Sequence, residues 1–231
     1  MLLSVGTQLA IAQTNKIDER QQRIKELIEA LASPNKPPSN WDREITIPAG
    51  YDRAAQQKVL DTWKALLHEG IDAFSLLVAN SGDRRYSCSL RGANGDVNVS
   101  VGGACRSILE QQVTVYDDVI SHPFQHSGPY YFEENRDLRK WWRERQHRTL
   151  RELQIEATEW VLLRLKHPSD RELRQLEQRT DEQRQDDIRK LGSFLDRLKA
   201  SNQPVQPKSI EGYGRMIGLS EKDGHSDKPH R

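Results

Sequence analysis

Four side chains near the middle of the chain are the ones most suited to metal-assisted chemistry. Asp117 and Asp118 precede His122 and His126, and the two histidines lie four residues apart. Imidazoles at this spacing converge on one ion when they share a helix. Pro123 and its loop-like surroundings disfavour a helix, so the alternative is an ordinary surface loop. The pattern supplies one hypothesis, a metal-assisted hydrolase with a loop site near Asp117, His122 and His126.

The stretch 85–101 predicts a β-hairpin, because turn chemistry and side-chain alternation agree there. Asn94-Gly95 favours a two-residue type I′ turn, in which both central residues need a positive φ. The residue numbers of facing partners would then sum to 189, with Leu90 opposite Val99. This register gives the hairpin one apolar face and one polar face, and a slip of one residue would destroy the pattern.

Both cysteines of the chain, Cys88 and Cys105, belong to this region. In the predicted register Cys88 lies opposite Val101, and Cys105 follows Val101 by about one helical turn. A disulfide would close a loop of 16 intervening residues and stabilise the fold by about 3 kcal/mol. The alternative is a pair of buried free thiols packed under the hairpin. No histidine nearby completes a zinc ligand set, and no metal or other cofactor is expected.

Residues 136–151 are strongly basic, with seven Lys or Arg and two Asp or Glu. Basic residues beside tryptophans can bind nucleic acid through phosphate contacts and base stacking. The preferred interpretation is a short helix whose apolar stripe packs on a core; its members are Leu138, Trp141 and Trp142. Arg139 and Arg143 then lie on the exposed face and become candidate contacts for a partner.

Tyr130, Tyr131 and Phe132 form an aromatic run in a segment without helical periodicity. Aromatic side chains are enriched in protein–protein interfaces. Two interpretations are open for this run: contact with a partner, or packing of the loop onto the core. Under the first interpretation these three residues join Arg139 and Arg143 as candidate partner contacts.

The first half of the chain shows apolar residues at helical spacing. Helices are expected over 17–32, over 52–69 and from Asp72 onward, with Gly70 ending the second of them. The segment "YDRAAQQKVLDTWKALLHEGIDAFSLLVANSGD" resembles one two-helix unit of HEAT-like α-solenoid repeats, and "IKELIEALASPN" and "VGGACRSILEQQV" are similar to parts of neighbouring units. The resemblance covers roughly residues 20–113 and implies a scaffold or partner-binding role.

The second half predicts helices opened by two capping boxes. Thr149 with Glu152 is expected to start a helix to about His167. Ser169 with Glu172 is expected to start another that continues to about Lys199.

The expected fold is mainly α, with a HEAT-like helical-repeat core and one inserted β-hairpin. The core is expected over 17–135, and a long C-terminal helical segment over 136–200. The Pro- and Gly-rich tail, 201–231, is expected to be disordered. Residues 1–16 are an apolar leader, either a truncated secretory signal or a frayed end of the first helix. Export to the periplasm or beyond is favoured over a cytoplasmic location, and the alternative stays open.

Composition narrows the function classes. The 231 residues include 35 Lys or Arg and 34 Asp or Glu, so no overall field favours nucleic acid or an anionic membrane. No apolar run approaches the roughly 18 residues of a membrane span. The sequence contains no nucleophile elbow, dinucleotide fingerprint or zinc-ribbon spacing. The expected function is a non-enzymatic protein-interaction or scaffold role with another protein as partner; the alternatives are the hydrolase above and nucleic-acid binding through 136–151.

Overall fold

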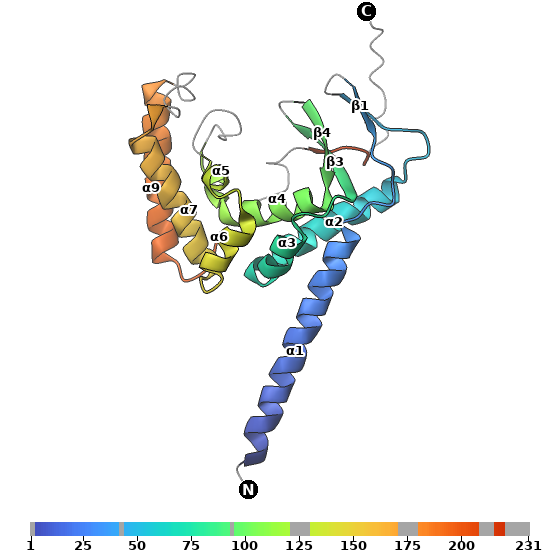
Figure 1. The fold of residues 1–231 in the computed structure, drawn as a ribbon. Coiled ribbons are helices and arrows are strands. Elements are labelled where there is room, and N and C mark those ends of the chain that lie inside the picture. The colour runs from blue at the N-terminus through green and yellow to red at the C-terminus, as the bar shows by residue number, and fades with distance from the viewer. Residues whose placement is uncertain are drawn as a thin grey trace, which may run out of the picture. The chain divides into compact units, whose positions relative to one another are not determined.

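The computed structural model describes residues 3–41, 44–92, 95–120, 130–170, 180–207 and 215–219. These residues are mainly helical and include a small antiparallel sheet (Figure 1). The chain divides into two compact units: Met1–Cys105 together with Arg215–Arg231, and Arg106–Gly214. The division falls between Cys105 and Arg106, inside a helix.

Three helices and a 3-10 turn open the first unit. Their bounds are α1 Leu3–Ala30, α2 Arg53–Glu69, the 3-10 helix η1 Gly70–Ala73 and α3 Phe74–Asn80. α1 packs against α2 and α3 through a buried stripe of Ile24, Ile28 and Leu31. The helix expected over 17–32 therefore begins earlier, inside the apolar leader. Figure 1 shows its N-terminal half extending beyond α2 and α3.

The ends of α2 follow the sequence signals. The side chain of Asp52 accepts a hydrogen bond from the backbone N–H of Ala55 at 2.9 Å, which caps the helix. Gly70 has φ 63°, the left-handed conformation that ends a helix most easily at glycine. Asp72 does not cap the next helix as expected, because the chain continues from Gly70 directly through the 3-10 turn into α3.

The described residues of the first unit include five short strands. β1 Ser39–Trp41 pairs with β2 Glu44–Thr46, and β3 Tyr86–Gly92, β4 Gly95–Ser100 and β5 Arg215–Met216 form a second sheet. The strand order of that sheet is β4-β3-β5, and its pairs are antiparallel. The predicted hairpin is confirmed as β3 and β4.

The predicted register of the hairpin is wrong by two residues. Leu90 lies opposite Val97 and Gly92 opposite Gly95, so the residue numbers of partners sum to 187 in place of 189. A shift of two keeps every side chain on its face, because the side-chain period of a strand is two. The alternation alone therefore could not distinguish the two registers. The turn was predicted at Asn94-Gly95, but Gly95 is the first residue of β4 and pairs with Gly92; positions 93 and 94 lie outside the described residues.

Both faces of β3 are buried, although one face was predicted to be polar and the other apolar. Cys88 and Leu90 are buried on one side, and Ser87 and Ser89 on the other. On the polar side the Ser89 hydroxyl donates to Asn98 Oδ1 at 2.7 Å, whereas the buried Ser87 hydroxyl has no hydrogen-bond partner among the described residues. Alternation predicted which residues share a face, but it could not show that the polar face is covered.

The C-terminal tail supplies the third strand. β5 pairs with Leu90 and Arg91 of β3, and the backbone N–H of Ile217 donates to the carbonyl of Ser89 at 2.8 Å. Met216 and Ile217 are both buried. The prediction that the tail is disordered is therefore wrong for residues 215–219.

The second unit contains most of the C-terminal helices. Their bounds are η2 Val115–Asp118, α5 Tyr131–Glu134, α6 Leu138–Arg145, α7 Leu150–Lys166 and α9 Asp181–Ala200; α4 Val101–Val113 leads into the unit from the first. Among the described helices none is both long and apolar enough to cross a membrane.

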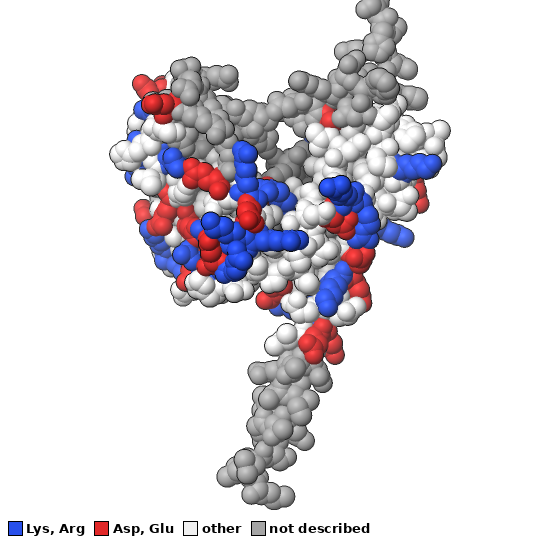
Figure 2. Space-filling model, in the orientation of Figure 1, with Lys and Arg blue, Asp and Glu red and all other residues white. Residues whose placement is uncertain are grey.

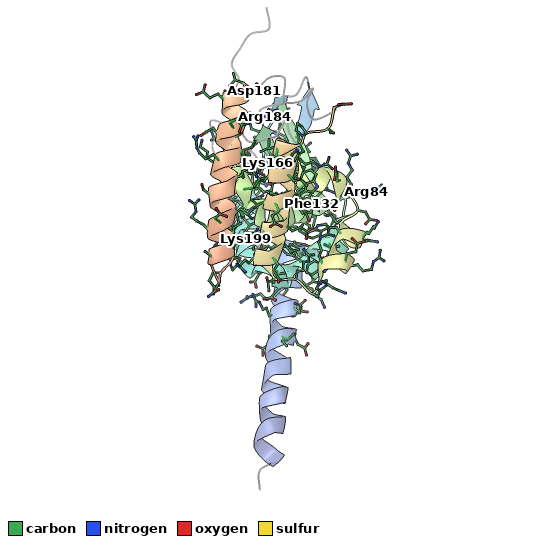
Figure 3. All side chains as sticks on the ribbon, turned by 90° about the vertical axis from the view of Figure 1, so that its left-hand side faces the viewer. Arg84, Phe132, Lys166, Asp181, Arg184 and Lys199 are labelled. Atoms are coloured by element: carbon green, nitrogen blue, oxygen red, sulfur yellow. The ribbon has the colours of Figure 1, made fainter. Side chains whose placement is uncertain are left out.

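α7 and α9 pack side by side in opposite directions. In Figure 3 Lys166, at the end of α7, lies toward the end of α9 that carries Asp181 and Arg184, and Lys199 lies toward the other end. Both helices have buried apolar residues, which on α7 are Leu153, Ala157, Val161 and Leu165 and on α9 are Leu191, Phe194, Leu195 and Leu198.

The capping signals of these helices were only partly predicted. The capping box of Thr149 and Glu152 is present at the start of α7. α9 starts instead at a second box, formed by Thr180 and Gln183, which the sequence interpretation overlooked. Thr180 has an extended backbone, with φ −74° and ψ 154°, so a single helix from Ser169 to Lys199 is wrong.

Candidate functional site

α6 is held on the second unit by its aromatic side chains. Leu138, Trp141 and Trp142 are buried, as the apolar stripe predicted. The Phe132 ring lies 5.1 Å from the Trp141 ring, centroid to centroid, and Figure 3 labels Phe132 among the side chains beside α7. Tyr131 makes an edge-on contact with Trp160 of α7 at 6.0 Å. These contacts bind α5, α6 and α7 into one packed cluster.

A chain of hydrogen bonds runs through this cluster. Trp141 Nε1 donates to the hydroxyl of Tyr131 at 3.0 Å, and that hydroxyl donates to Glu156 Oε1 at 2.7 Å. Arg145 Nε donates to the same carboxylate at 2.9 Å, and Arg148 also pairs with it. Burial opposes ionisation of Glu156, but the hydrogen bonds from Arg145 and Tyr131 outweigh it and lower its pKa.

The opposite side of α6 carries three exposed cations, Arg139, Lys140 and Arg143, which we call the basic face. Their side chains form no ion pair with any described residue. Neighbouring arginines of the same unit are neutralised: Arg106 by Glu110 at 2.6 Å, Arg164 by Glu134, and Arg145 and Arg148 by Glu156. Figure 2 shows blue atoms gathered over the region where Figure 1 draws α6. The basic face is therefore available charge on a rigid support.

Two carboxylates bound the basic face along the helix. Asp137 is exposed and caps α6 by accepting a hydrogen bond from the backbone N–H of Lys140 at 3.0 Å. Glu144 is 52% exposed and lies 3.2 Å from Arg145. The three cations of the basic face therefore lie between Asp137 and Glu144, and the partly buried Arg145 follows Glu144 and pairs with it.

The three residues of the aromatic run differ in how deeply they are buried. Tyr131 and Phe132 are buried, which matches the packing alternative for these two residues. Tyr130 is half-buried, and its hydroxyl donates to Glu110 Oε2 at 2.8 Å. Burial raises the pKa of Glu110, while Arg106 and Tyr130 oppose that rise. Contact of the run with a partner stays a prediction, and within the described chain its three residues have partners of their own.

Cys88 and Cys105 are free, buried thiols in the structure. Cys88 lies opposite Val99, not opposite Val101 as the predicted register required. Burial raises the pKa of both thiols to about 12, so little thiolate is present near neutral pH and reactivity is low. This arrangement agrees with the packed-thiol alternative, and a disulfide in an oxidising compartment stays a prediction.

The hypothetical hydrolase site cannot be assembled from the described residues. Asp117 lies in η2, where its backbone N–H donates to the carbonyl of Thr114 at 2.9 Å. His122 and His126 fall outside the described part of the chain. Among the residues that are described, no group of three His, Cys, Asp or Glu side chains could hold a metal ion.

Two members of the α6 site were missed in the sequence. Lys140 lies three positions before Arg143, a spacing that makes them neighbours on a helix and could have identified it. Glu156 carries no local signal, because the arginines it neutralises lie eight and eleven positions earlier across a helix break. No family model, curated protein or solved structure matches this chain.

Proposed function

We propose that the protein is a non-enzymatic interaction protein that binds another protein through the basic face of α6. The observation that carries the proposal is the contrast in charge pairing. Arg139, Lys140 and Arg143 lie within five positions of one helix and have no ion pair within the described chain, whereas Arg106, Arg145, Arg148 and Arg164 of the same unit each pair with a carboxylate. Exposed charges contribute little to the fold itself, so a cluster of three unpaired cations on one helix is free to contact a partner.

The surroundings of α6 support the same role. Trp141 and Trp142 are buried beneath α6, so the helix backbone that carries the exposed cations is held in place. Preorganised contacts lose less entropy on binding than mobile ones. The resemblance of residues 20–113 to HEAT-like repeats points in the same direction, because such repeats act as scaffolds.

The proposal is tested by charge reversal with a matched control. The variant R139E/K140E/R143E and the control K25E/K58E/K64E change the net charge equally, and all six residues are exposed. Each tagged protein is cross-linked in the cells that produce it, and the captured proteins are compared quantitatively. We expect the α6 variant to lose partners that the control retains. If the folded α6 variant keeps every partner of the unmodified protein, the proposed function is wrong.

A further inference from the structure

The chemistry of the basic face also indicates what it binds. We infer that the partner presents a short acidic protein segment, with its carboxylates clustered and flanked by neutral or basic residues. This inference deepens the proposed function and rests on it.

The spacing of the cations matches closely spaced carboxylates. Arg139 and Arg143 are four residues apart, and Lys140 and Arg143 three apart, so each pair has its Cβ atoms roughly 5–6 Å apart on the helix surface. Carboxylates on alternate residues of an extended segment are separated by roughly 6.6 Å. Each guanidinium can bind one carboxylate with two parallel hydrogen bonds. Two or three acidic side chains of one segment can therefore pair with the basic face at once.

The bounding carboxylates select a short acidic cluster over a long polyanion. α6 has eight residues and is about 12 Å long. A nucleic acid carries phosphate charge continuously along its length. A strand that crossed the basic face along α6 would bring phosphates next to the exposed carboxylate of Asp137, which repels them, and next to Glu144, whose charge is partly balanced by Arg145. A protein segment can place neutral or basic residues at those two positions.

The tryptophans do not serve as a stacking surface. Binding of single-stranded nucleic acid combines phosphate contacts with bases stacked on aromatic rings. Trp141 is 2% exposed and Trp142 9% exposed, so neither ring is available to a base. The tryptophan-containing helix can therefore recognise a partner through its charge, but not through base stacking. This favours an acidic protein segment over the nucleic-acid alternative.

Binding to defined probes tests the inference. The probes are a fluorescent peptide with an alternating Asp and Glu core between lysines, the same peptide with Asn and Gln in the core, and single-stranded oligothymidine. Fluorescence anisotropy is measured with the full chain at one fixed salt concentration. We expect the acidic peptide to bind more tightly than the other two probes. R139A/K140A/R143A should weaken it at least about tenfold, and K25A/K58A/K64A should leave it unchanged.

A further variant examines the bounding charge. Asp137→Asn should strengthen oligothymidine binding, because it removes a carboxylate that repels phosphates while asparagine can still cap the helix. Equal or tighter binding of oligothymidine by the unmodified chain would overturn the inference in favour of nucleic acid. Absence of acidic-peptide binding, while the α6 charge reversal still loses its cellular partners, would overturn the acidic-segment inference alone. Retention of all partners by that variant would instead overturn the proposed function.

Discussion

Trp141 Nε1 donates a hydrogen bond to the Tyr131 hydroxyl at 3.0 Å, so that one hydroxyl joins three helices. Tyr131 begins α5, Trp141 lies in α6, and the hydroxyl donates onward to Glu156 of α7. The basic face of α6 is positioned by this buried connection. Its strength can be measured without altering any exposed residue.

Tyr131→Phe should destabilise the second unit by about 1–3 kcal/mol, because it leaves a buried indole N–H without an acceptor. The measurement is urea unfolding followed by near-ultraviolet circular dichroism. Trp141→Phe alone should also destabilise the unit. In the Trp141→Phe background, Tyr131→Phe should lower the free energy of unfolding by less than it does in the unmodified protein, because the hydrogen bond to the indole is already absent. If the two losses in free energy of unfolding were fully additive, a direct interaction between Trp141 and Tyr131 would be contradicted.

Glu156→Gln should remove a pH-dependent part of the stability. The pKa of Glu156 in the fold lies below its ordinary value of 4.5, so the folded protein binds fewer protons there than the unfolded chain. The stability advantage of the unmodified protein over the variant should be present at pH 7 and should fade as the pH falls below 4.5. Glu182→Gln, at an exposed carboxyl, serves as control. If the difference in free energy of unfolding between the unmodified protein and Glu156→Gln stayed constant down to acidic pH, the ion pair with Arg145 would be contradicted.

Gln154→Ala should release the segment that follows α9. The Gln154 side chain donates to the carbonyl of Val205 at 2.7 Å and accepts from its backbone N–H at 2.9 Å. We expect the Val205 amide to exchange with solvent faster and the unit to lose about 1–2 kcal/mol. Hydrogen exchange with mass spectrometry measures the first effect. Gln146→Ala, at an exposed position, should change neither the exchange of the Val205 amide nor the stability. Unchanged exchange of that amide in Gln154→Ala would contradict the role of the two hydrogen bonds in holding the segment.

Gly102→Ala should be strongly destabilising, because a Cβ atom there would lie 2.5 Å from the backbone oxygen of Ser81. Gly192 has no neighbour within 4 Å of such an atom and lies inside α9. Gly192→Ala should therefore stabilise the protein by about 0.5–1 kcal/mol through helix propensity. Both predictions are checked by comparing the thermal unfolding of the two variants with that of the unmodified protein. Equal effects at the two positions would show that the close approach at Ser81 is not rigid.

The number of free thiols among Cys88 and Cys105 can be measured directly. With pKa values of about 12, both should resist alkylation at neutral pH in the folded protein and react once it is denatured. The measurement is the mass of protein alkylated in denaturant without reductant. Two added groups confirm free thiols. Alkylation that requires prior reduction would instead establish the disulfide predicted from the sequence.

The local signals in the sequence predicted local structure well. Asp52, Gly70 and the box of Thr149 and Glu152 fix helix ends because each acts within one turn of its own position. The apolar stripe on 138–142 placed Trp141 and Trp142 on the buried side correctly. These features depend on neighbours in the chain, so a single sequence carries them.

Features that depend on distant contacts were missed. The register of β3 and β4 could not be chosen, because a shift of two residues leaves the alternation intact. The pairing of Arg91 with Arg215 joins positions more than a hundred residues apart, and composition alone marked the tail as disordered. The same applies to the α6 site: Arg139 and Arg143 were identified from charge, but the neutralisation of their neighbours by Glu156 is a tertiary contact.

The pairing of β5 with β3 makes the first unit discontinuous in the chain, with the second unit inserted between its two parts. During synthesis the ribosome therefore releases α1 through β4 long before the strand that completes their sheet. Until Met216 and Ile217 emerge, the carbonyl of Ser89 lacks the N–H that satisfies it in the finished fold. The nascent first unit has an open sheet edge for as long as the second unit is being made, which is the interval in which a chaperone or another chain could occupy it.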